Sequence, residues 1–418
     1  MVVAETLPAG LRLVTESMPH VRSVTVGVWI KRGSRHESDA EAGVAHFVEH
    51  MLFKGTTTRS AQVIAQTIDS IGGQLDAFTA KEYAGYYIKV LDEHLPLAID
   101  LLADMVMRPA LMPADIEREQ SVILEEIKMV EDAPDDLVHE VFVQQFWDQH
   151  PLGRPILGTP DTVRSFTAPL LRAYFERTYL APNLVVAAAG NLHHDRLRDL
   201  VARAFADLPP LAHAAEEAPP VVSPGLIVRE KDIEQSHVCL GTRAYPQAHD
   251  DRHAIFVMNT ILGGSMSSRL FQHIREDRGL AYAVWSSLIS YSDAGALTIY
   301  AGCAVDRVHE VIELTLAELA TMRDAPVAPD ELQRAKDHLK GSLMLSLENT
   351  SSRMSQLARQ ELMFRHQFTL DEILGSIDAV TADDVRRVSR ELFCDGAVVA
   401  TVVGPAMAQP LTMNMLKV

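Results

Sequence analysis

The sequence predicts an α+β fold made of two homologous halves, each with a mainly antiparallel sheet packed against helices. A Pro/Ala/Glu-rich segment, 209–220, divides the 418 residues almost in the middle and is typical of an extended linker. Short motifs on one side of this segment recur on the other. Strand-like runs and helices follow one another without steady strand–helix–strand alternation, which favours antiparallel sheets over a doubly wound one.

Two pairs of motifs indicate the duplication. Pro113–Arg118 is matched by Pro329–Arg334, 216 positions later, and each is a Pro-initiated, acid-rich helix start. Phe166–Arg172 is matched by Val380–Arg386, 214 positions later, and each is followed by a β-branched run that ends in Gly. The expected organisation is an N-terminal half over 1–208, a linker over 209–224 and a C-terminal half over 225–418.

The expected elements follow from periodicity. Short runs rich in β-branched residues predict strands at Val24–Ile30, Gln74–Thr79, Tyr86–Val90, Val185–Ala189, Leu226–Arg229, His237–Leu240, Ala296–Ala301 and Val398–Val403. Apolar residues three and four apart predict helices at Ala61–Ile71, Leu95–Met107, Pro113–Val130, Val308–Met322 and Pro329–Leu347.

Composition narrows the class of protein. A net charge of −18 argues against nucleic acid as a partner and permits cationic ones, including basic peptides. No apolar run is long enough for a transmembrane helix, and the first residues resemble neither a secretory nor a transit peptide, so no membrane association is expected. The three cysteines, Cys239, Cys303 and Cys394, lie in apolar contexts and are expected to be buried and reduced, which predicts a cytoplasmic location.

The motif His46-Phe47-Val48-Glu49-His50 carries the clearest chemistry. Two histidines four apart project from one face of a helix, a spacing that suits two ligands of a tetrahedral zinc. Glu49 leans over the same face and can accept a proton from a metal-bound water. The surrounding residues are apolar, a setting in which an unpaired His-Glu-His cluster would be costly. The order H-x-x-E-H is that of the inverzincins.

An acidic helix supplies candidates for a third ligand. Glu119 and Glu126 are two helical turns apart and face one way, whereas Glu125 points about 100° away from Glu126. In one interpretation Glu126 binds zinc and Glu119 orients a ligating histidine or the water. In the other, these acids form a solvated face paired with Arg118 and Lys128. Spacing alone leaves both interpretations open. In the second half the matching positions hold Ala335 and Ser342, so only the first half can hold the metal.

The segments Gly33–Glu37 and Gly43–Thr56 closely resemble the signature of the pitrilysin/insulinase family of zinc peptidases, most closely its short branch, the bacterial homologues of the mitochondrial processing peptidase β-subunit. The resemblance covers essentially the whole chain. It implies one Zn²⁺ per chain, with His46, His50 and Glu126 as ligands, Glu49 as general base and Glu119 as a supporting carboxylate. The implied activity is that of a zinc endopeptidase acting on unfolded peptides.

The segment 71–79 resembles the substrate-binding edge strand of that family. The resemblance implies that an extended peptide adds to this strand through its unpaired backbone groups. Asp76 stands where the family usually has Asn, and together with the acidic charge it makes a basic substrate the expectation. The residues implied in substrate binding are Gly73, Leu75, Asp76, Ala77, Phe78 and Thr79.

The segment 270–284 resembles an Arg/Tyr element of the family, with Arg275 and Tyr282 in its two positions. The resemblance implies that both groups reach the peptide carbonyl from the second half and help to hold the developing oxyanion. It also implies that the halves form a clam-shell around a peptide chamber and close for turnover.

Because both half-sites are present in one chain, a homodimer is expected to be the active form. Two alternatives are a catalytic chain that needs a distinct partner to capture substrate, and a non-catalytic assembly subunit. The presence of every metal ligand argues against the latter.

Overall fold

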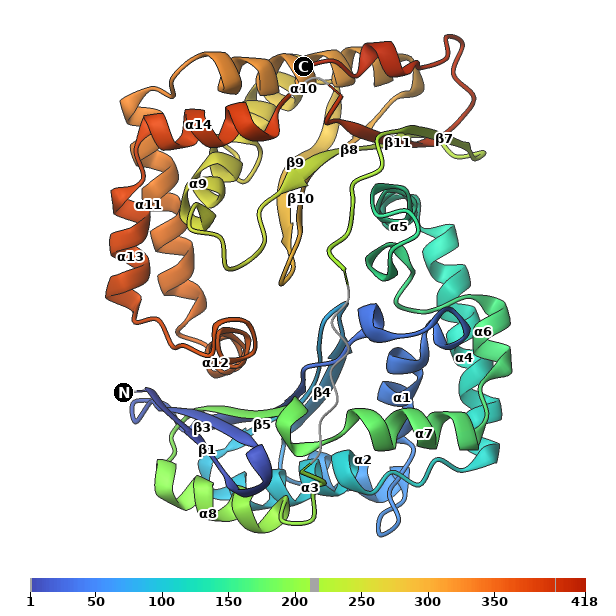
Figure 1. Ribbon diagram of the computed structural model, residues 1–418, viewed down its shortest axis with the longest axis vertical. Helices are drawn as coiled ribbons and strands as arrows, with labels where there is room; N and C mark the ends of the chain where they lie inside the picture. Colours follow the sequence, from blue (N-terminus) through green and yellow to red (C-terminus); the bar gives the residue numbers. More distant parts are fainter. Residues whose placement is uncertain (1, 211–217, 395) are drawn as a thin grey trace. The chain divides into compact units, whose positions relative to one another are not determined.

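The computed structural model describes residues 2–210, 218–394 and 396–418 and contains two compact units. Unit 1 consists of Met1–Lys128, Arg154–Glu217 and Leu345–Gln367, and unit 2 consists of Met129–Gly153, Ala218–Met344 and Phe368–Val418. Each unit is built on one sheet (Figure 1). The predicted α+β class with two mainly antiparallel sheets is therefore confirmed.

The sheet of unit 1 has the strand order β1-β2-β6-β3-β5-β4. Neighbouring strands are antiparallel except for the parallel pair β2–β6. The strands, in chain order, are β1 Val2–Thr6, β2 Arg12–Ser17, β3 Ser23–Ile30, β4 Gln74–Thr79, β5 Ala84–Leu91 and β6 Leu184–Gly190. The all-buried strand β6 (LVVAAAG) lies inside the sheet, and β4 forms one edge.

Helices cover both faces of this sheet. One face packs against α1, α3, α7 and α8 in a core that includes Val26, Ile88 and Phe47. The opposite face packs against α12, whose Met354, Leu357, Ala358 and Leu362 contact Val14, Trp29 and Val185. The helices of unit 1, of which α4 runs on into unit 2, are α1 Val44–Phe53, α2 Ala61–Ser70, α3 Leu95–Met107, α4 Pro113–Asp132, α6 Pro160–Ser165, α7 Ala168–Thr178, α8 His194–Ala204 and α12 Thr350–Phe364.

The sheet of unit 2 repeats this plan with the order β7-β11-β8-β10-β9, in which β7 and β11 are parallel. Its strands are β7 Leu226–Glu230, β8 Ser236–Ala244, β9 Ala281–Ser290, β10 Gly295–Cys303 and β11 Val399–Gly404. One face packs against α9, α10 and α14, and the other against α5. The helices are α5 Pro134–Phe146, α9 Arg252–Leu262, the π-helix Phe271–Glu276, α10 Val308–Asp324, α11 Pro329–Ser346, α13 Leu370–Ala379 and α14 Ala382–Leu392.

The two sequence halves exchange one helix each. Helix α5 belongs to the first half of the chain but packs on the second sheet, and α12 belongs to the second half but packs on the first. The compact units therefore do not coincide with the two halves residue for residue. The predicted division at 209–224 stays a prediction about the duplication, and residues 211–217 of that linker lie outside the described residues.

The structure can be compared with the strands, helices and cysteine environments predicted from the sequence. The predicted strands and helices are present within a few residues of their expected ends, and β4 and α3 match them fully. Strands β1, β2 and β9 were not expected, because their alternation is short or interrupted.

Cys239 and Cys303 are buried, but the expectation for Cys394 is wrong: it is exposed just beyond α14. Within the described residues no helix is both long and apolar enough to span a bilayer.

Candidate zinc centre

Helix α1 presents His46, Glu49 and His50 from the face that is not buried in the core. Between residues 42 and 50, these three are the positions that retain partial exposure, because the apolar residues around them pack inward. The helix begins at Val44, and its N-cap residue is Gly43, whose φ of +95° suits glycine. The buried Glu37 carboxylate accepts hydrogen bonds from the backbone N–H groups of Gly43 and Ala45, both at 2.8 Å. This carboxylate caps the helix where its dipole favours negative charge.

The three predicted zinc ligands converge. Nε2 of His46 lies 3.7 Å from one carboxylate oxygen of Glu126, and Nε2 of His50 lies 3.6 Å from the other. Candidate ligand atoms of His46, His50 and Glu126 all lie within 4.8 Å of one another, and among the described residues they form the group suited to a metal. Ligands about 2.0–2.1 Å from a tetrahedral zinc would be separated by roughly 3.3–3.5 Å. The donor set therefore fits Zn²⁺.

Protonation also suits metal binding. Burial, with a smaller contribution from the neighbouring His50, lowers the pKa of His46 to about 4, so its imidazole is neutral near pH 7. A neutral imidazole is the form that binds metal. Nδ1 of His46 is buried and has no hydrogen-bond partner among the described residues.

Glu119 fixes the orientation of His50. Its carboxylate is 4% exposed and accepts a hydrogen bond from Nδ1 of His50 at 3.0 Å. Because a carboxylate only accepts, the proton is on Nδ1 and Nε2 is left for the metal. The other oxygen of Glu119 contacts the Lys54 ammonium at 2.7 Å. Glu119 and Glu126 face α1, whereas Glu125 pairs with Lys128 at the surface. The interpretation as a solvated face thus applies to Glu125, and the role of Glu126 as a zinc ligand stays a prediction.

Glu49 is held by the neighbouring edge strand. The hydroxyl of Thr79 donates to a Glu49 carboxylate oxygen at 2.5 Å. Burial raises the pKa of Glu49, and the hydrogen bond from Thr79 opposes that shift. A carboxylate with a raised pKa is closer to the range in which a general base works well near neutral pH.

Strand β4, which contains most of the predicted substrate-binding residues, is an edge of the sheet. Leu75 and Ala77 pack toward the main core, and Phe78 lies edge-on to Trp29 with ring centroids 5.0 Å apart. Asp76 points outward and accepts from the hydroxyl of Tyr87 at 3.0 Å. These side chains leave the free backbone edge of β4 as the surface that an extended peptide could join. Gly73 precedes the strand, where an added Cβ would lie 3.0 Å from Val90.

Arg275 and Tyr282 are close to each other in unit 2. The Arg275 guanidinium lies 4.8 Å from the ring centroid of Tyr282 and 4.7 Å from that of Phe271. Tyr282 is 80% exposed at the start of β9. The structure thus brings these two predicted residues together, and their action on a substrate held in unit 1 stays a prediction.

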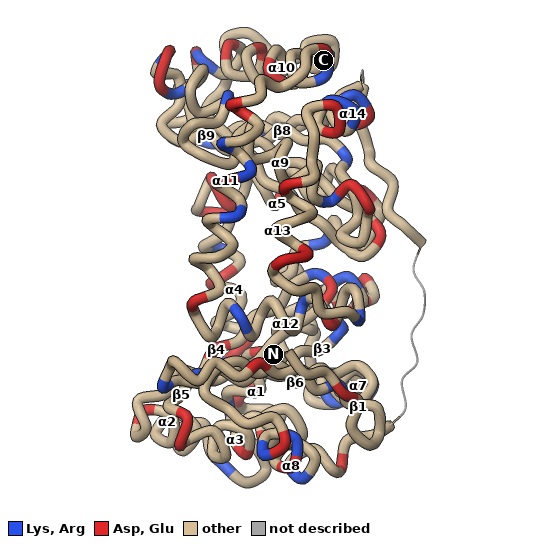
Figure 2. The backbone as a smooth tube through the Cα atoms, turned by 90° about the vertical axis from the view of Figure 1, so that its left-hand side faces the viewer, with Lys and Arg blue, Asp and Glu red and all other residues tan. Residues whose placement is uncertain are grey.

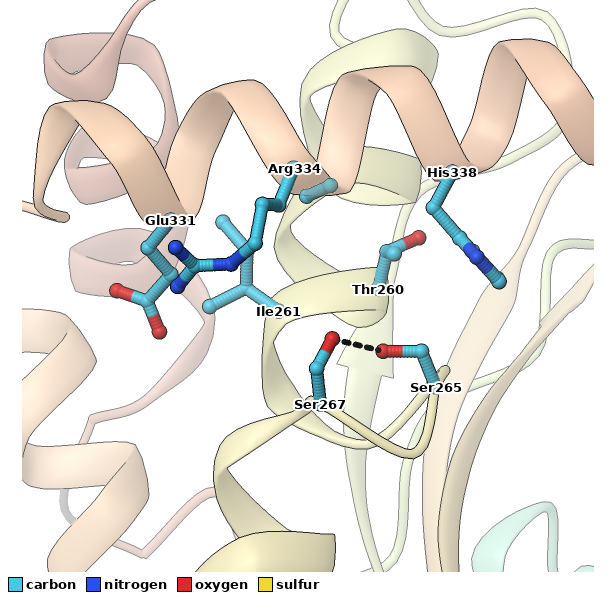
Figure 3. A pocket seen from close by; sticks show the side chains of 8 residues that line it. Thr260, Ile261, Ser265, Ser267, Glu331, Arg334 and His338 are labelled. Atoms are coloured by element: carbon cyan, nitrogen blue, oxygen red, sulfur yellow. Dashed lines mark hydrogen bonds between the residues drawn. The ribbon is translucent and has the colours of Figure 1, made fainter.

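The counterpart of the zinc site in unit 2 lacks its ligands. By element order α9 and α11 correspond to α1 and α4, and between them lies a cavity of about 20 Å³. Figure 3 shows that hydroxyl groups, Arg334 and His338 line it, with Ser265 and Ser267 hydrogen-bonded at 3.3 Å. No pair of histidines with a carboxylate occurs in this lining.

Sequence reasoning missed two contributions to the site. Lys54 was not assigned a role, although it lies four residues after His50 and so on the same helix face. The predicted role of Thr79 in substrate binding stays a prediction, and the structure adds a contact of its hydroxyl with Glu49. The spacing of Lys54 from His50 is a local signal. The contacts of Lys54 with Glu119 and of Thr79 with Glu49 leave no signal in spacing, because each joins elements far apart in the chain.

Comparisons with known proteins agree with this arrangement. Residues 12–160 match the insulinase (peptidase family M16) model, and residues 165–339 match the peptidase M16 inactive domain. The uncharacterized zinc protease YmxG of Bacillus subtilis is 43% identical over 96% of this chain and 98% of its own length. An uncharacterized zinc protease of Mycobacterium leprae is 42% identical over 99% of this chain and 94% of its own length.

Two solved structures share the fold. A peptidase M16 inactive domain from Pseudomonas fluorescens superposes with a TM-score of 0.92 at 21% identity, covering 98% of this chain and 100% of that one. A protease from Helicobacter pylori gives 0.90 at 22% identity, covering 97% and 100%.

The family model and the relatives identify a zinc-dependent peptidase. The chain belongs to the insulinase family, peptidase family M16. It is a metalloendopeptidase that uses Zn²⁺, as the resemblance implied.

Proposed function

We propose that this chain cleaves unfolded peptides with zinc held by His46, His50 and Glu126 and with Glu49 as general base. The observation that carries the proposal is the convergence of both Nε2 atoms on the two oxygens of Glu126, with Glu49 on the same helix face. When bound, zinc supplies a water of lowered pKa and polarises the scissile carbonyl.

The residues of this chain then have separate tasks. Glu49 accepts the proton of the attacking water and returns it to the leaving amine. Thr79 holds the Glu49 carboxylate at 2.5 Å on the side of the edge strand. The free edge of β4 binds the peptide backbone by strand addition, which selects extended, unfolded segments. Arg275 and Tyr282 donate to the developing oxyanion, and turnover requires the halves to close around the peptide as a clam-shell.

The expected substrate carries basic residues near the scissile bond. Asp76 is exposed on β4 and is not among the proposed zinc ligands, so its negative charge remains beside the strand when zinc offsets the charges of Glu126 and Glu49. Figure 2 shows acidic and basic positions interspersed along the rest of the chain. A peptide-library cleavage profile tests this expectation, and a preference for acidic residues around the scissile bond would contradict it.

Two substitutions test the assignment of roles. Glu49→Gln is expected to retain zinc and lose cleavage by at least about a hundred-fold, because the base is removed and the ligands remain. Glu126→Gln is expected to lose zinc, measured by metal analysis after dialysis, because the carboxylate ligand is gone. Full zinc occupancy in Glu126→Gln would reject the ligand set.

The pure protein separates the remaining alternatives. Chelator-sensitive cleavage by this chain alone, with size-exclusion chromatography showing a dimer, supports the proposed homodimer. An inactive chain that regains cleavage with a second polypeptide would instead assign a partner to substrate capture. Cleavage by a monomeric fraction from size-exclusion chromatography would reject the homodimer as the active form.

A further inference from the structure

Lys54 directly follows the metal-site helix α1. It is the C-cap residue of α1 and lies four residues after His50, which itself lies four residues after His46. Its ammonium is 2.7 Å from one oxygen of Glu119, while the other oxygen accepts from Nδ1 of His50 at 3.0 Å. His50 of α1 and Lys54 directly after it therefore hold a single carboxylate of α4 from both sides.

This ion pair differs from the surface pairs of the same helix. Lys128 and Glu125 also lie 2.7 Å apart, but both side chains are about two-thirds exposed (66% and 68%). Exposed pairs of that kind contribute little. The Glu119 side chain is only 5% exposed, and a buried carboxylate that loses one partner is left with an unsatisfied charge. The position of Glu119 therefore depends on its ion pair with Lys54. The position of Glu125 does not depend in this way on its ion pair with Lys128.

The backbone at Lys54 is itself anchored. The Lys54 N–H donates to the Met51 carbonyl at 3.1 Å, which ends α1. Two residues later the Thr56 hydroxyl donates to the buried Asp104 carboxylate at 2.6 Å. The lysine side chain thus reaches Glu119 from a fixed point.

We propose that Lys54 is a positioning residue of the zinc site: it holds Glu119 so that His50 presents Nε2 to the metal. This inference rests on the ligand set proposed above. A positive charge beside a cation site opposes metal binding by itself. If Lys54 helps the protein to retain zinc, it can therefore do so only through Glu119 and His50. The direct repulsion of the metal by Lys54 weakens zinc retention, whereas the positioning of Glu119 strengthens it.

The rate of zinc loss distinguishes the two effects. We expect zinc-loaded Lys54→Met to release zinc to excess chelator about ten-fold faster than the unsubstituted protein, the scale found for partners of metal ligands. Lys54→Arg is expected to release zinc almost as slowly as the unsubstituted protein, because it keeps a donor and a positive charge. Lys128→Met is the matched control and is expected to leave the rate unchanged. A rate for Lys54→Met that is unchanged or slower would overturn the proposal.

A double-substitution cycle tests the route through Glu119. Glu119→Gln is expected to speed zinc loss. Lys54→Met added to it is expected to cause no further acceleration and to slow the loss slightly, because only the direct repulsion by the Lys54 ammonium is left to remove. Equal effects of Lys54→Met in both backgrounds would overturn the proposal.

Two further measurements distinguish failure of this proposal from failure of the proposed ligand set and from failure of a variant to fold. If Glu126→Gln retains zinc, the proposed ligand set fails whatever Lys54 does. Thermal denaturation of the zinc-free proteins reports folding, and Lys54→Ala, which removes the donor without placing a long apolar chain beside Glu119, replaces Lys54→Met if the latter fails to fold. Zinc loss from Lys54→Ala no faster than from Lys128→Met would then overturn the proposal.

Discussion

At the scale of single residues, the general base depends on one hydroxyl from the neighbouring strand. Glu49 is partly buried beside His50, and burial raises its pKa. The Thr79 hydroxyl at 2.5 Å stabilises the charged carboxylate and opposes that shift. Strand β4, which we propose binds the peptide, therefore also influences the pKa of the general base Glu49.

Replacing Thr79 is expected to move the pH dependence of catalysis. Thr79→Val removes a hydrogen bond to the charged form, so the pKa of Glu49 rises further and the acid limb of kcat/KM moves up by about one pH unit. The rate is expected to fall by up to about ten-fold on the acid side of the limb and to be unchanged on its alkaline side. Thr79→Ser keeps the donor and is expected to retain the original profile. An acid limb that does not move in Thr79→Val would contradict this role.

At the scale of elements, the turn after α1 is held by one buried carboxylate of α3. Asp104 is fully buried and accepts from Thr56, Thr58, Arg59 and Arg108 at 2.6–2.9 Å. Although burial alone would raise the pKa of this carboxyl, these donors outweigh it and lower the pKa to about 2. The turn that follows His50 and Lys54 is thereby fixed to the core.

Asp104→Asn is expected to lower the free energy of unfolding by about 2 kcal/mol at pH 7, because buried donors lose a charged acceptor. The folded-state pKa is below the usual 3.8, so the contribution is present above about pH 4 and is lost as pH falls toward 2. Urea denaturation across this range measures both effects. Asp100→Asn is the matched control, because Asp100 also pairs with Arg59 but is largely exposed, and a change below about 0.5 kcal/mol is expected. Equal losses in the two variants would contradict the anchoring role.

At the scale of the whole molecule, the helix exchange makes each compact unit depend on both halves of the chain. Without α12, the face formed by Val14, Trp29 and Val185 would be exposed, and without α5 the same holds for Cys239 and Val399. Large exposed apolar faces favour aggregation. Arg12 of β2 also forms a 2.8 Å ion pair with the buried Glu361 of α12.

Separate expression of residues 1–210 and 218–418 is expected to give poorly soluble fragments, whereas co-expression is expected to give a complex that co-purifies. Leu357→Asp in the second fragment places a charge in the α12 core and is expected to abolish recovery of the first. Size-exclusion chromatography and near-ultraviolet circular dichroism provide the measurement. A first fragment that is monomeric and folded alone would show that α12 is dispensable.

Much of the fold follows from local pattern. The edge strand β4 and helix α3 have the bounds predicted from periodicity, and the repeated motifs at Pro113 and Pro329 begin corresponding helices. Helix exchange could not be predicted, because α5 and α12 are amphipathic and would suit either sheet. Which sheet each one covers depends on the path of the chain between the units, which leaves no trace in periodicity.

The chemistry of the metal site was determined by the sequence itself. A helix places residues four apart on one face, so His46, Glu49 and His50 are arranged by a single local element, and Glu119 and Glu126 by another. Only the tertiary structure decided that both carboxylates face α1, that Glu119 is shared between His50 and Lys54, and that Thr79 contacts the base. These contacts join residues many positions apart, and their geometry depends on how helices and strands pack rather than on any one element.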